Sequence, residues 1–588
     1  MSLAVVRWIA GPVLHAVKQG PFSLRESVRV GAQALLGEVV RIHDDEIVVQ
    51  VYEDTTGLRP GTEVRGDGLP LSIRVGPGLL GRIFDGLLRP LSGTDSAFVQ
   101  PGMRSGGGLR LQFEPRVDVA AVVAPGAVIG SARSAAGRPQ LCLAPPDQGG
   151  VVEWVAAAGE YADDAVVCVL RQGDGRRSEL AMSHVWPVRV PRPVARRLPT
   201  QTPLVTGQRI LDCLFPVAQG GKAAIPGGFG TGKTVLLEAL AKGCNADVIV
   251  YLGCGERGNE MAGVLDEFPR LTDPRTDRPL MERTVIIANT SNMPVAAREA
   301  SIYCAITVAE YFRDQGLHVA LMADSTSRWA EALREVSGRF GELPGEGGYP
   351  AYLSSRLADF YERAALVETL ASSTGSVTVM GAISPPSGDF SEPVTSHTKR
   401  YVKAFWALDV KRAQARFYPA IHPLQSYAED AGEFAPWWAA QGNGQWLVLR
   451  RRFLTLLDEQ AQLERMARII GKDALPARQQ LTLLCAELIN EAFLRQSAFS
   501  EIDRVCSPAR QSAMMRLLGR FIDLAETALA AGVETERIAA LACLRALQRM
   551  GEEIGDDQLP RLAELEARVE REFAQLAPAT EAHDAAHG

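Results

Sequence analysis

The sequence predicts a multidomain α/β protein with an N-terminal β-barrel, an inserted β-rich module, a parallel-sheet domain and a C-terminal helical domain. Short strand-like segments fill the first 70 residues, and apolar runs alternate with amphipathic stretches from about 190 to 440. Beyond residue 440 the chain is rich in Leu, Ala, Arg and Glu. Because 588 residues exceed one hydrophobic core, we expect about three or four domains.

Two stretches have the composition of β-structure. The first contains three Val- and Ile-rich segments separated by turn residues, namely Val5–Ile9, Ala34–Ile42 and Glu46–Tyr52. Strands this short and closely spaced predict a small barrel over residues 1–72. The second stretch follows a glycine joint at Gly106–Gly108, and it predicts an inserted β-rich module over residues 110–185.

Residues 73–109 and 186–440 are expected to form one α/β domain. Its short apolar segments, each followed by a loop and a helix-like stretch, are typical of strands buried on both faces of a parallel sheet. These segments are Ala246–Leu252, Thr284–Ala288 and Val319–Met322.

Residues 441–588 are expected to form the helical domain. Apolar side chains recur there at the spacing of one helix face, as at Leu484, Leu488, Ile489, Ala492 and Phe493. The Ala-, His- and Asp-rich tail from Ala577 to Gly588 is predicted to be disordered.

The overall composition argues against several classes of protein. A net charge of −7 gives no electrostatic case for nucleic acid as a partner. The first 25 residues lack the apolar core of a secretory signal, and no apolar run reaches the ~18 residues that cross a bilayer. Nine singly placed cysteines, without CxxC pairs, are typical of buried thiols in a reducing compartment. We therefore expect a cytoplasmic protein that reaches a membrane only through partners.

A phosphate-binding loop is the strongest chemical signal in the chain. The pattern GxxxxGK[ST] is matched by consecutive residues, namely Gly227, Gly228, Phe229, Gly230, Thr231, Gly232, Lys233 and Thr234. The glycines let backbone N–H groups turn inward around phosphate oxygens, and the next helix adds its positive dipole end. Lys233 is expected to reach the β- and γ-phosphates of ATP or ADP, and Thr234 to bind Mg²⁺. Val235 begins the predicted helix and is included in the nucleotide site.

Two carboxylates follow predicted strands. The segment His318–Ala323 ends at Asp324, which we expect to support the metal ion, although a lone aspartate there more commonly caps a helix. Glu256 follows the strand Val248–Leu252 and is a candidate for orienting water in line with the γ-phosphate. Arg257 beside it would neutralise phosphate charge, although this segment alone is equally typical of a solvated turn. Because ligands bind at the carboxyl ends of parallel strands, Glu256 and Asp324 are expected to face one crevice.

Together these segments resemble the catalytic A subunit of the vacuolar/archaeal-type rotary ATPases, in the form also found in bacteria. The resemblance covers nearly the whole chain and is far more specific than the phosphate loop. The segments that show it include Tyr52–Gly61, Gly76–Leu91, Thr206–Thr234, Gly253–Glu260, Asn289–Glu299, Met322–Glu331, Pro344–Leu353, Ser384–Thr395 and Cys506–Pro508. It implies a RecA-like P-loop NTPase that hydrolyses or synthesises ATP.

The resemblance also implies partners. A subunits alternate with B subunits in a hexamer around a rotating central stalk, and each B subunit supplies an arginine finger. Peripheral stalk subunits and a membrane ring that moves protons or sodium complete the complex, which would hold this chain at the inner face of the cell membrane. The barrel would join neighbours into a crown, and the 110–185 module would project towards a peripheral stalk. The C-terminal helices and the loop Gly341–Tyr349 would lie near the shaft.

The resemblance extends to individual residues. It implies that Lys233 and Thr234 hold phosphates and Mg²⁺, and that Asp324 supports the metal. It also implies that Glu256 is the catalytic carboxylate and that Arg257 contacts the γ-phosphate. Arg328 matches a position where related F-type catalytic subunits also have a phosphate-side arginine. Phe229 matches the loop aromatic that distinguishes A subunits from their F-type counterparts.

Two departures from the family pattern concern the nucleotide site. The usual Asn-Trp pair is replaced by His422-Pro423, which is closer to the F-type pattern, and Tyr418 is the best candidate for stacking on adenine. Phe434 is either a second wall of that pocket or, more commonly for such a residue, a core aromatic. Thr231 stands where eukaryotic enzymes have a loop cysteine, so a disulfide switch there is excluded.

Three other functions are less consistent with the sequence. A hexameric nucleic-acid motor of the termination-factor type needs a basic, aromatic-lined surface, whereas in the first 70 residues Tyr52 is isolated among acids. A secretion-system ATPase is not expected to contain the 110–185 insertion. A non-catalytic nucleotide-binding subunit would have a degenerate phosphate loop or would lack Glu256.

Overall fold

The computed structural model describes residues 2–91, 99–103, 109–133, 137–471 and 474–576. The predicted joint at Gly106–Gly108 and the predicted disordered tail from Ala577 lie outside these residues. The chain divides into two compact units. The first comprises Met1–Thr200, Gln219–Ala224 and Ala246–Val402, and the second comprises Gln201–Ala218, Ile225–Asn245 and Lys403–Gly588. Each unit is described by itself.

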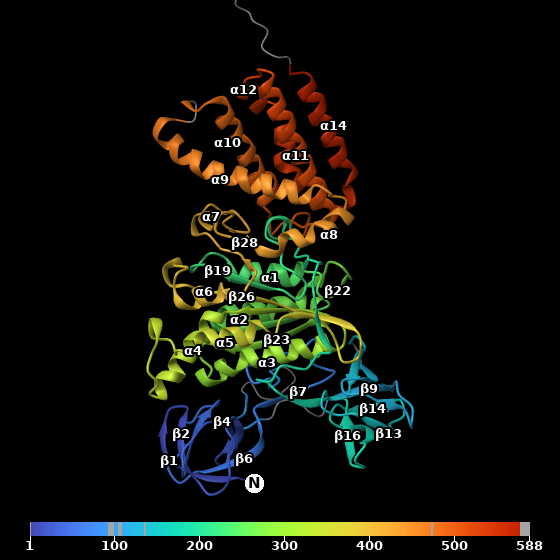
Figure 1. Ribbon diagram of the computed structural model, residues 1–588, viewed down its shortest axis with the longest axis vertical. Helices are drawn as coiled ribbons and strands as arrows, with labels where there is room; N and C mark the ends of the chain where they lie inside the picture. The colour runs from blue at the N-terminus through green and yellow to red at the C-terminus, as the bar shows by residue number, and fades with distance from the viewer. Residues whose placement is uncertain (1, 92–98, 104–108, 134–136, 472–473, 577–588) are drawn as a thin grey trace, which may run out of the picture. The chain divides into compact units, whose positions relative to one another are not determined.

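The first unit begins with a closed six-stranded barrel, drawn in blue in Figure 1. Its antiparallel strands follow the order β1-β2-β5-β4-β3-β6. They are β1 (Leu3–Ala10), β2 (Val13–Lys18), β3 (Glu26–Val30), β4 (Leu35–Ile42), β5 (Glu46–Val51) and β6 (Glu63–Pro70). Alternate Val, Leu and Ala side chains fill the interior, as expected of strands with one buried face. The predicted N-terminal barrel is confirmed.

Two four-stranded sheets form the inserted β-rich module of the first unit. One has the order β10-β13-β15-β16 and the other β12-β11-β9-β14, and both contribute to one apolar core. The strands are β9 (Arg110–Pro115), β10 (Val122–Val123), β11 (Val128–Arg133), β12 (Gln140–Leu143), β13 (Gly150–Val155), β14 (Gly159–Ala162), β15 (Val166–Arg171) and β16 (Arg177–Ala181). Two strands that flank the module in sequence, β7 (Ser72–Val75) and β17 (His184–Pro187), pair with each other.

The central sheet of the first unit positions the carboxylates. Its strands include, in order, β19 (Lys222–Pro226), β26 (Thr374–Ile383), β24 (His318–Asp324), β20 (Val248–Glu256), β23 (Thr284–Thr290) and β8 (Ile83–Asp85). The last two residues of β19 belong to the second unit. From β26 to β8 all neighbours are parallel, which confirms the predicted parallel sheet. β20 continues four residues beyond the predicted end of its strand and includes Glu256 itself.

Helices and short strands complete the first unit. The helices are α2 (Gly258–Glu267), α3 (Val295–Asp314), α4 (Thr326–Arg339), α5 (Leu353–Tyr361) and α6 (Pro393–Thr398), and α3 is buried along nearly its whole length. The remaining strands are β18 (Arg196–Leu198), β21 (Thr272–Asp273), β22 (Arg278–Pro279) and β25 (Ala365–Glu368). β25 is antiparallel to β26 and also pairs with β18.

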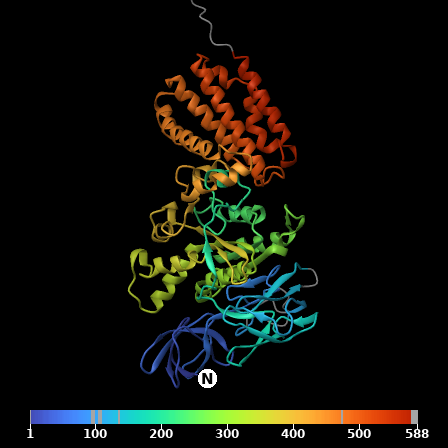
Figure 2. The same ribbon diagram turned by 45° about the vertical axis from the view of Figure 1, so that its right-hand side comes forward.

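The second unit contains the phosphate loop, its helix and the C-terminal helices, drawn in orange and red in Figure 2. Helix α1 (Lys233–Gly243) follows the loop, and the short strands β27 (Ala404–Phe405) and β28 (Tyr427–Ala428) pair with each other. The other helical segments are η1 (Ile210–Leu214), α7 (Val410–Gln414), η6 (Glu429–Phe434), α8 (Ala435–Ala440), α9 (Trp446–Ile470), α10 (Ala477–Ile489), η8 (Asn490–Leu494), α11 (Pro508–Ala530), α12 (Thr535–Ala539), α13 (Cys543–Glu553), η9 (Asp556–Gln558) and α14 (Pro560–Ala574). The predicted C-terminal helical domain is confirmed.

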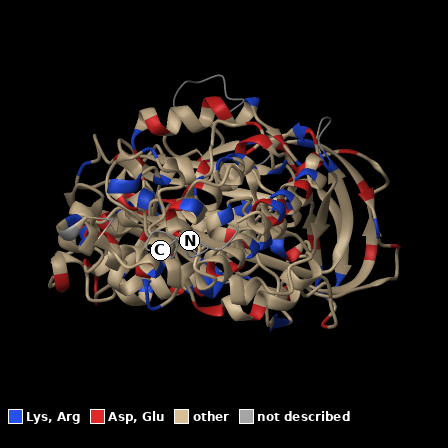
Figure 3. Ribbon diagram, turned by 90° about the horizontal axis from the view of Figure 1, so that it is seen from above, with Lys and Arg blue, Asp and Glu red and all other residues tan. Residues whose placement is uncertain are grey.

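Several sequence-level expectations concern the chain as a whole. All nine cysteines are buried, as predicted. Among the described residues, no helix is both long and apolar enough to span a bilayer. Figure 3 shows Lys and Arg interspersed with Asp and Glu along the ribbon.

Candidate functional site

The phosphate loop connects β19 to helix α1 and has the backbone that its glycines predict. Gly230 and Gly232 have positive φ angles of 75° and 84°, a region that residues with a side chain rarely adopt. The Lys233 ammonium donates to the carbonyl oxygens of Gly227 and Gly228, at 2.7 and 2.9 Å. The Thr231 hydroxyl donates to the Gly228 carbonyl at 2.8 Å and closes the turn. The lysine therefore lies along the inside of its own loop.

The loop fits a phosphate chain for steric reasons as well. A Cβ at Gly227 would lie 2.5 Å from the Thr231 hydroxyl and 2.8 Å from the Leu408 Cβ, so no larger residue is accommodated. A Cβ at Gly230 or Gly232 would meet no atom within 4 Å, so both positions are open to a ligand. The first turn of α1 directs its backbone N–H groups and positive dipole end towards this opening.

Tyr418 lies beside the start of helix α1. Its hydroxyl is 3.4 Å from the Val235 carbonyl oxygen, which it faces as a donor. Its own carbonyl accepts from the Gln496 N–H at 2.7 Å, so the residue is held from two sides. Burial raises the pKa of the Tyr418 phenol well above its usual range, and the Glu238 charge adds to the shift. The phenol therefore stays neutral and suits a stacking role.

Three phenylalanines of the second unit differ sharply in exposure. Phe434 is only 1% exposed and is a core residue, not a wall of a nucleotide pocket. Phe229 in the phosphate loop is 81% exposed, and Phe499 is 99% exposed. Phe499 lies three residues after Gln496, which is bonded to Tyr418, and sequence reasoning missed it. The one sequence feature that could have pointed to Phe499 is its position shortly after an apolar helical segment.

In the first unit, Glu256 and Asp324 end neighbouring parallel strands. Asp324 is opposite Gly253 in the register of β20 and β24, three residues before Glu256. The register shifts between Cys254 and Glu256, where Gly255 has a φ of 73°. Such an irregularity re-aims the following side chain. The structure thus brings the two predicted carboxylates to one edge of the sheet.

The two carboxylates interact electrostatically. Burial, together with the Asp324 charge and the Glu260 carboxyl, raises the pKa of Glu256 to about 8, whereas Arg328 acts to lower it. Asp324 is 2% exposed, and its carboxylate accepts from the Tyr251 hydroxyl at 3.5 Å. A pair of repelling, partly buried carboxylates is an arrangement that a divalent cation relieves.

Arginines surround this edge. Arg328 lies in the first turn of α4 and pairs with Glu331 at 3.0 Å, and Arg257 is exposed just before α2. Sequence reasoning gave no role to Arg298, which is 9% exposed in the first turn of α3. A Cβ at Gly255 would lie 2.8 Å from both the Arg298 side chain and the Arg328 Cβ. The buried Arg298 Nε has no hydrogen-bond partner among the described residues, which is unusual for a buried guanidinium.

The predicted site residues therefore form two groups. Glu256, Asp324 and Arg328 are together in the first unit, with Arg257 next to them in sequence. The phosphate loop, Val235 and Tyr418 are in the second unit.

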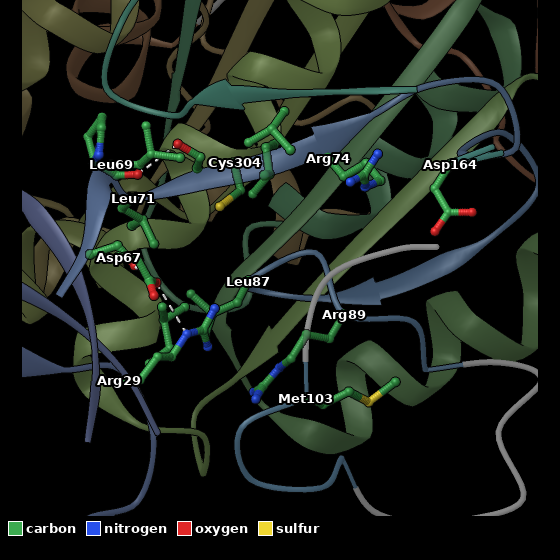
Figure 4. A pocket seen from close by; sticks show the side chains of 16 residues that line it. Arg29, Asp67, Leu69, Leu71, Arg74, Leu87, Arg89, Met103, Asp164 and Cys304 are labelled. Carbon is green, nitrogen blue, oxygen red and sulfur yellow. Dashed lines mark hydrogen bonds and ion pairs between the residues drawn. The ribbon is translucent and has the colours of Figure 1, made fainter. Parts of the chain in front are cut away.

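A separate cavity of about 420 Å³ lies in the first unit, and Figure 4 shows its lining. Its arginines are already engaged. Arg29 pairs with Asp67 at 3.3 Å, and Arg89 pairs with both Glu53 and Asp85 at 2.7 Å. No predicted site residue lines this cavity, so we assign nucleotide chemistry to the loop and the sheet edge.

Four family models match the chain. The nucleotide-binding domain of the ATP synthase alpha/beta family matches residues 207–428, and its beta-barrel domain matches residues 6–68. The barrel-sandwich domain of the ATP synthase alpha/beta subunits matches residues 109–189. The C-terminal domain of V and A type ATP synthases matches residues 435–539.

Curated relatives resemble the chain over nearly its full length. The A subunit of the A-type ATP synthase from Methanopyrus kandleri is 48% identical, with 97% of each chain covered. The corresponding protein of Thermococcus onnurineus is 47% identical, over 97% of this chain and 98% of its own. Among solved structures, the assembled ATPase EscN of the enteropathogenic E. coli type III secretion system aligns with a TM-score of 0.63. That alignment covers 88% of this chain and all of EscN at 22% identity, so it supports the fold alone.

Proposed function

The chain belongs to the family of A-type ATP synthase A subunits, and from that membership and its site residues we propose how it handles ATP. As a catalytic A subunit it is an ATP hydrolase or synthase of a multisubunit complex. We propose that Gly227–Val235 enclose the phosphates, with Lys233 on the β- and γ-phosphates. Glu256 orients the attacking water, and Arg257 and Arg328 neutralise phosphate charge. Arg298 adds a further cation, which its unpartnered buried Nε supports.

The base-side residues of the proposed site are aromatic. Tyr418 stacks on adenine, since its hydroxyl bonds to the Val235 carbonyl at the start of α1 and its backbone carbonyl is held by the Gln496 N–H. We propose Phe499 as a second wall, because its ring is 99% exposed and it follows Gln496, whose N–H donates to the Tyr418 carbonyl, by three residues. This assignment replaces Phe434, whose side chain is in the core.

The residues present also fit Mg²⁺. The Thr234 hydroxyl and the Asp324 carboxylate are hard oxygen ligands, and Mg²⁺ typically takes few protein ligands and completes its shell with water and phosphate. Among the described residues there is no cluster of three or more His, Cys, Asp or Glu that could hold a metal ion. A site in which phosphate and water complete the metal's shell does not need such a cluster. When bound, Mg²⁺ would neutralise charge that develops on the phosphates.

The family also supports a proposal about partners and place. The chain alternates with B subunits in a hexamer, and a B subunit supplies the arginine finger. Central and peripheral stalk subunits link it to a membrane ring that moves protons or sodium, so the chain is peripheral on the cytoplasmic face of the membrane. Nucleic acid is not among the proposed partners, and the link to the membrane ring is indirect.

We propose four domains on the same basis. They are the barrel over 1–72, the nucleotide-binding domain over 73–109 and 186–440, the inserted module over 110–185, and the helical domain over 441–588. The barrel joins neighbours into a crown and the inserted module faces a peripheral stalk. The loop Gly341–Tyr349, in which Leu343 is 91% exposed, faces the shaft with the C-terminal helices.

The raised pKa of Glu256 beside Asp324 is the observation that most supports a hydrolytic site. In the assembled complex, Glu256→Gln should bind ATP with near wild-type affinity but lose steady-state hydrolysis by about 10²–10³-fold, because an amide cannot accept the proton of the attacking water. Phosphate release and nucleotide binding measure the two effects.

The control is Glu552→Gln, an exposed glutamate of α13, which should leave both quantities unchanged. Wild-type turnover in Glu256→Gln would remove Glu256 from its role. It would favour the alternative that this chain binds nucleotide without catalysis.

A further inference from the structure

The loop that contains Tyr418 is anchored beside the phosphate loop. The Leu408 N–H donates to the carbonyl of Pro226, the residue just before Gly227, at 2.8 Å. The Asp409 N–H donates to the Ala420 carbonyl at 2.8 Å, and Leu408 forms a bridge to Ile421. Residues 409–420 therefore form a closed loop whose base is fixed to the start of the phosphate loop.

Within this loop, Arg412 contacts the helical bundle. Its guanidinium lies 4.5 Å from the centre of the Phe417 ring, in a cation–π contact. The Phe417 N–H in turn donates to the Arg412 carbonyl at 2.9 Å. At the same time, the Arg412 Nη2 donates to the Asn490 Oδ1 at 2.8 Å. One guanidinium thus joins the neighbour of Tyr418 to the end of helix α10.

Asn490 is itself rigidly held. Its amide nitrogen donates to the Gln460 side chain on α9 at 2.9 Å and to the Ala486 carbonyl on α10 at 3.0 Å. Six residues later, the Gln496 N–H bonds to the Tyr418 carbonyl. Gln496 is 1% exposed, and its side chain donates to the carbonyls of Gly207 and Asp503 at 2.8 Å each. Phe417 and Tyr418 are therefore attached to the bundle at two adjacent points.

We propose that Arg412 is a positioning residue for the base side of the nucleotide site, which holds Phe417 and thereby Tyr418 against helices α9 and α10. The inference rests on the proposed function, because it takes Tyr418 as the ring that stacks on adenine. A planar guanidinium can stack on a ring and donate to an amide oxygen simultaneously, which a lysine ammonium cannot do in the same geometry. Arg412 is not among the residues proposed to hold the phosphates, so its effect should be confined to binding of the base.

The test compares a ligand that has a base with one that lacks it. In the assembled complex, Arg412→Met should raise KM for ATP about 5–20-fold and weaken ADP binding by a similar factor, with kcat within about twofold. Pyrophosphate, which lacks the base, should bind as in the wild type. Arg412→Lys should recover only part of the ADP affinity, because it keeps the charge without the planar fork.

Two further variants separate positioning from general damage. Asn490→Ala cuts the same link from the bundle side and should reproduce the loss of ADP affinity even if Arg412→Met fails to fold. Arg416→Lys, an exposed arginine of the same loop, should change neither ligand's affinity.

Unchanged ADP affinity in both Arg412→Met and Asn490→Ala would overturn the inference, as would an equal loss of pyrophosphate binding. If Lys233→Ala also leaves ADP and pyrophosphate affinity unchanged, the proposed function fails as well. If Lys233→Ala abolishes binding of both, only the role of Arg412 is lost.

Discussion

The phosphate loop and the carboxylate edge of the sheet are built in opposite ways. The loop is eight consecutive residues whose backbone follows from its glycines, and the Lys233 contacts lie within six residues of sequence. The carboxylate edge is assembled from the ends of β20 and β24 and the first turns of α3 and α4, from residues up to 72 positions apart. The chemistry of a contiguous motif can be inferred from its own residues. The pKa values and ion pairs of an assembled cluster depend on several segments and cannot be inferred from any one of them.

The largest expected effect comes from the contiguous region. Lys233→Ala should weaken ADP and ATP binding by at least about 30-fold and lower kcat/KM by about 10³-fold, because it removes the loop's only side-chain cation from the phosphates. Equilibrium binding of ADP to the assembled complex measures the first effect. Lys242→Ala, at the far end of the same helix, is the matched control and should bind ADP normally. Unchanged affinity in Lys233→Ala would disprove the phosphate-loop assignment.

A smaller loss is expected at the assembled edge. Arg298→Ala should lower kcat/KM by about 10²-fold and leave ADP affinity within a few-fold, because a buried cation beside Gly255 acts mainly where charge develops on the γ-phosphate. Arg298→Lys should restore part of the activity, and folding is monitored by thermal unfolding. If Arg298→Ala impairs thermal stability alone, the residue is structural and its unpartnered Nε has no catalytic meaning.

The sequence predicted most of the fold because each domain has its own residue pattern. The barrel strands, such as Val5–Ile9, are rich in Val and Ile, and the sheet strands are largely apolar. In the helical domain, Leu488 and Ala492 recur at helical spacing and are buried. For the candidate site, the sequence indicated the phosphate loop, because it is contiguous, and a shared sheet edge for Glu256 and Asp324, because each follows a strand. The roles suggested for Arg298 and Phe499 were not predicted, because both depend on neighbours distant in sequence.

The next prediction concerns the pH dependence of activity, an intermediate effect that is expected from the carboxylate edge and not from the phosphate loop. The pKa of Glu256 is raised to about 8, so at pH 7 only about a tenth of the nucleotide-free protein has the ionised carboxylate. Because kcat/KM reports the free enzyme, it should rise about five- to tenfold from pH 7 to 9, with its acid limb near pH 8. Glu260→Gln removes a carboxyl that raises this pKa, so the limb should move to lower pH.

The same shift predicts a stability effect of known sign. The pKa of Glu256 in the folded state lies above its unfolded value of 4.5, so between these two pKa values the folded state binds more protons. Stability therefore falls as pH rises from the unfolded pKa to the folded pKa of about 8. Glu256→Gln should therefore flatten the pH dependence of the unfolding midpoint of the nucleotide-free protein. A wild-type pH profile in Glu260→Gln, together with an unchanged stability profile in Glu256→Gln, would contradict the raised pKa.

The smallest expected functional effect separates two phenylalanines that the sequence does not distinguish. Phe499→Ala removes an exposed ring and should weaken ADP binding by about three- to tenfold with little change in the unfolding midpoint, because stacking contributes roughly 1 kcal/mol. Phe434→Ala leaves a cavity in the core and should lower the free energy of unfolding by about 3–5 kcal/mol. Measuring ADP affinity and thermal unfolding in both variants tests the contrast. If Phe434→Ala proves to be the variant with the selective loss of ADP affinity, the second wall of the adenine pocket lies there, and the exposed ring of Phe499 has another partner.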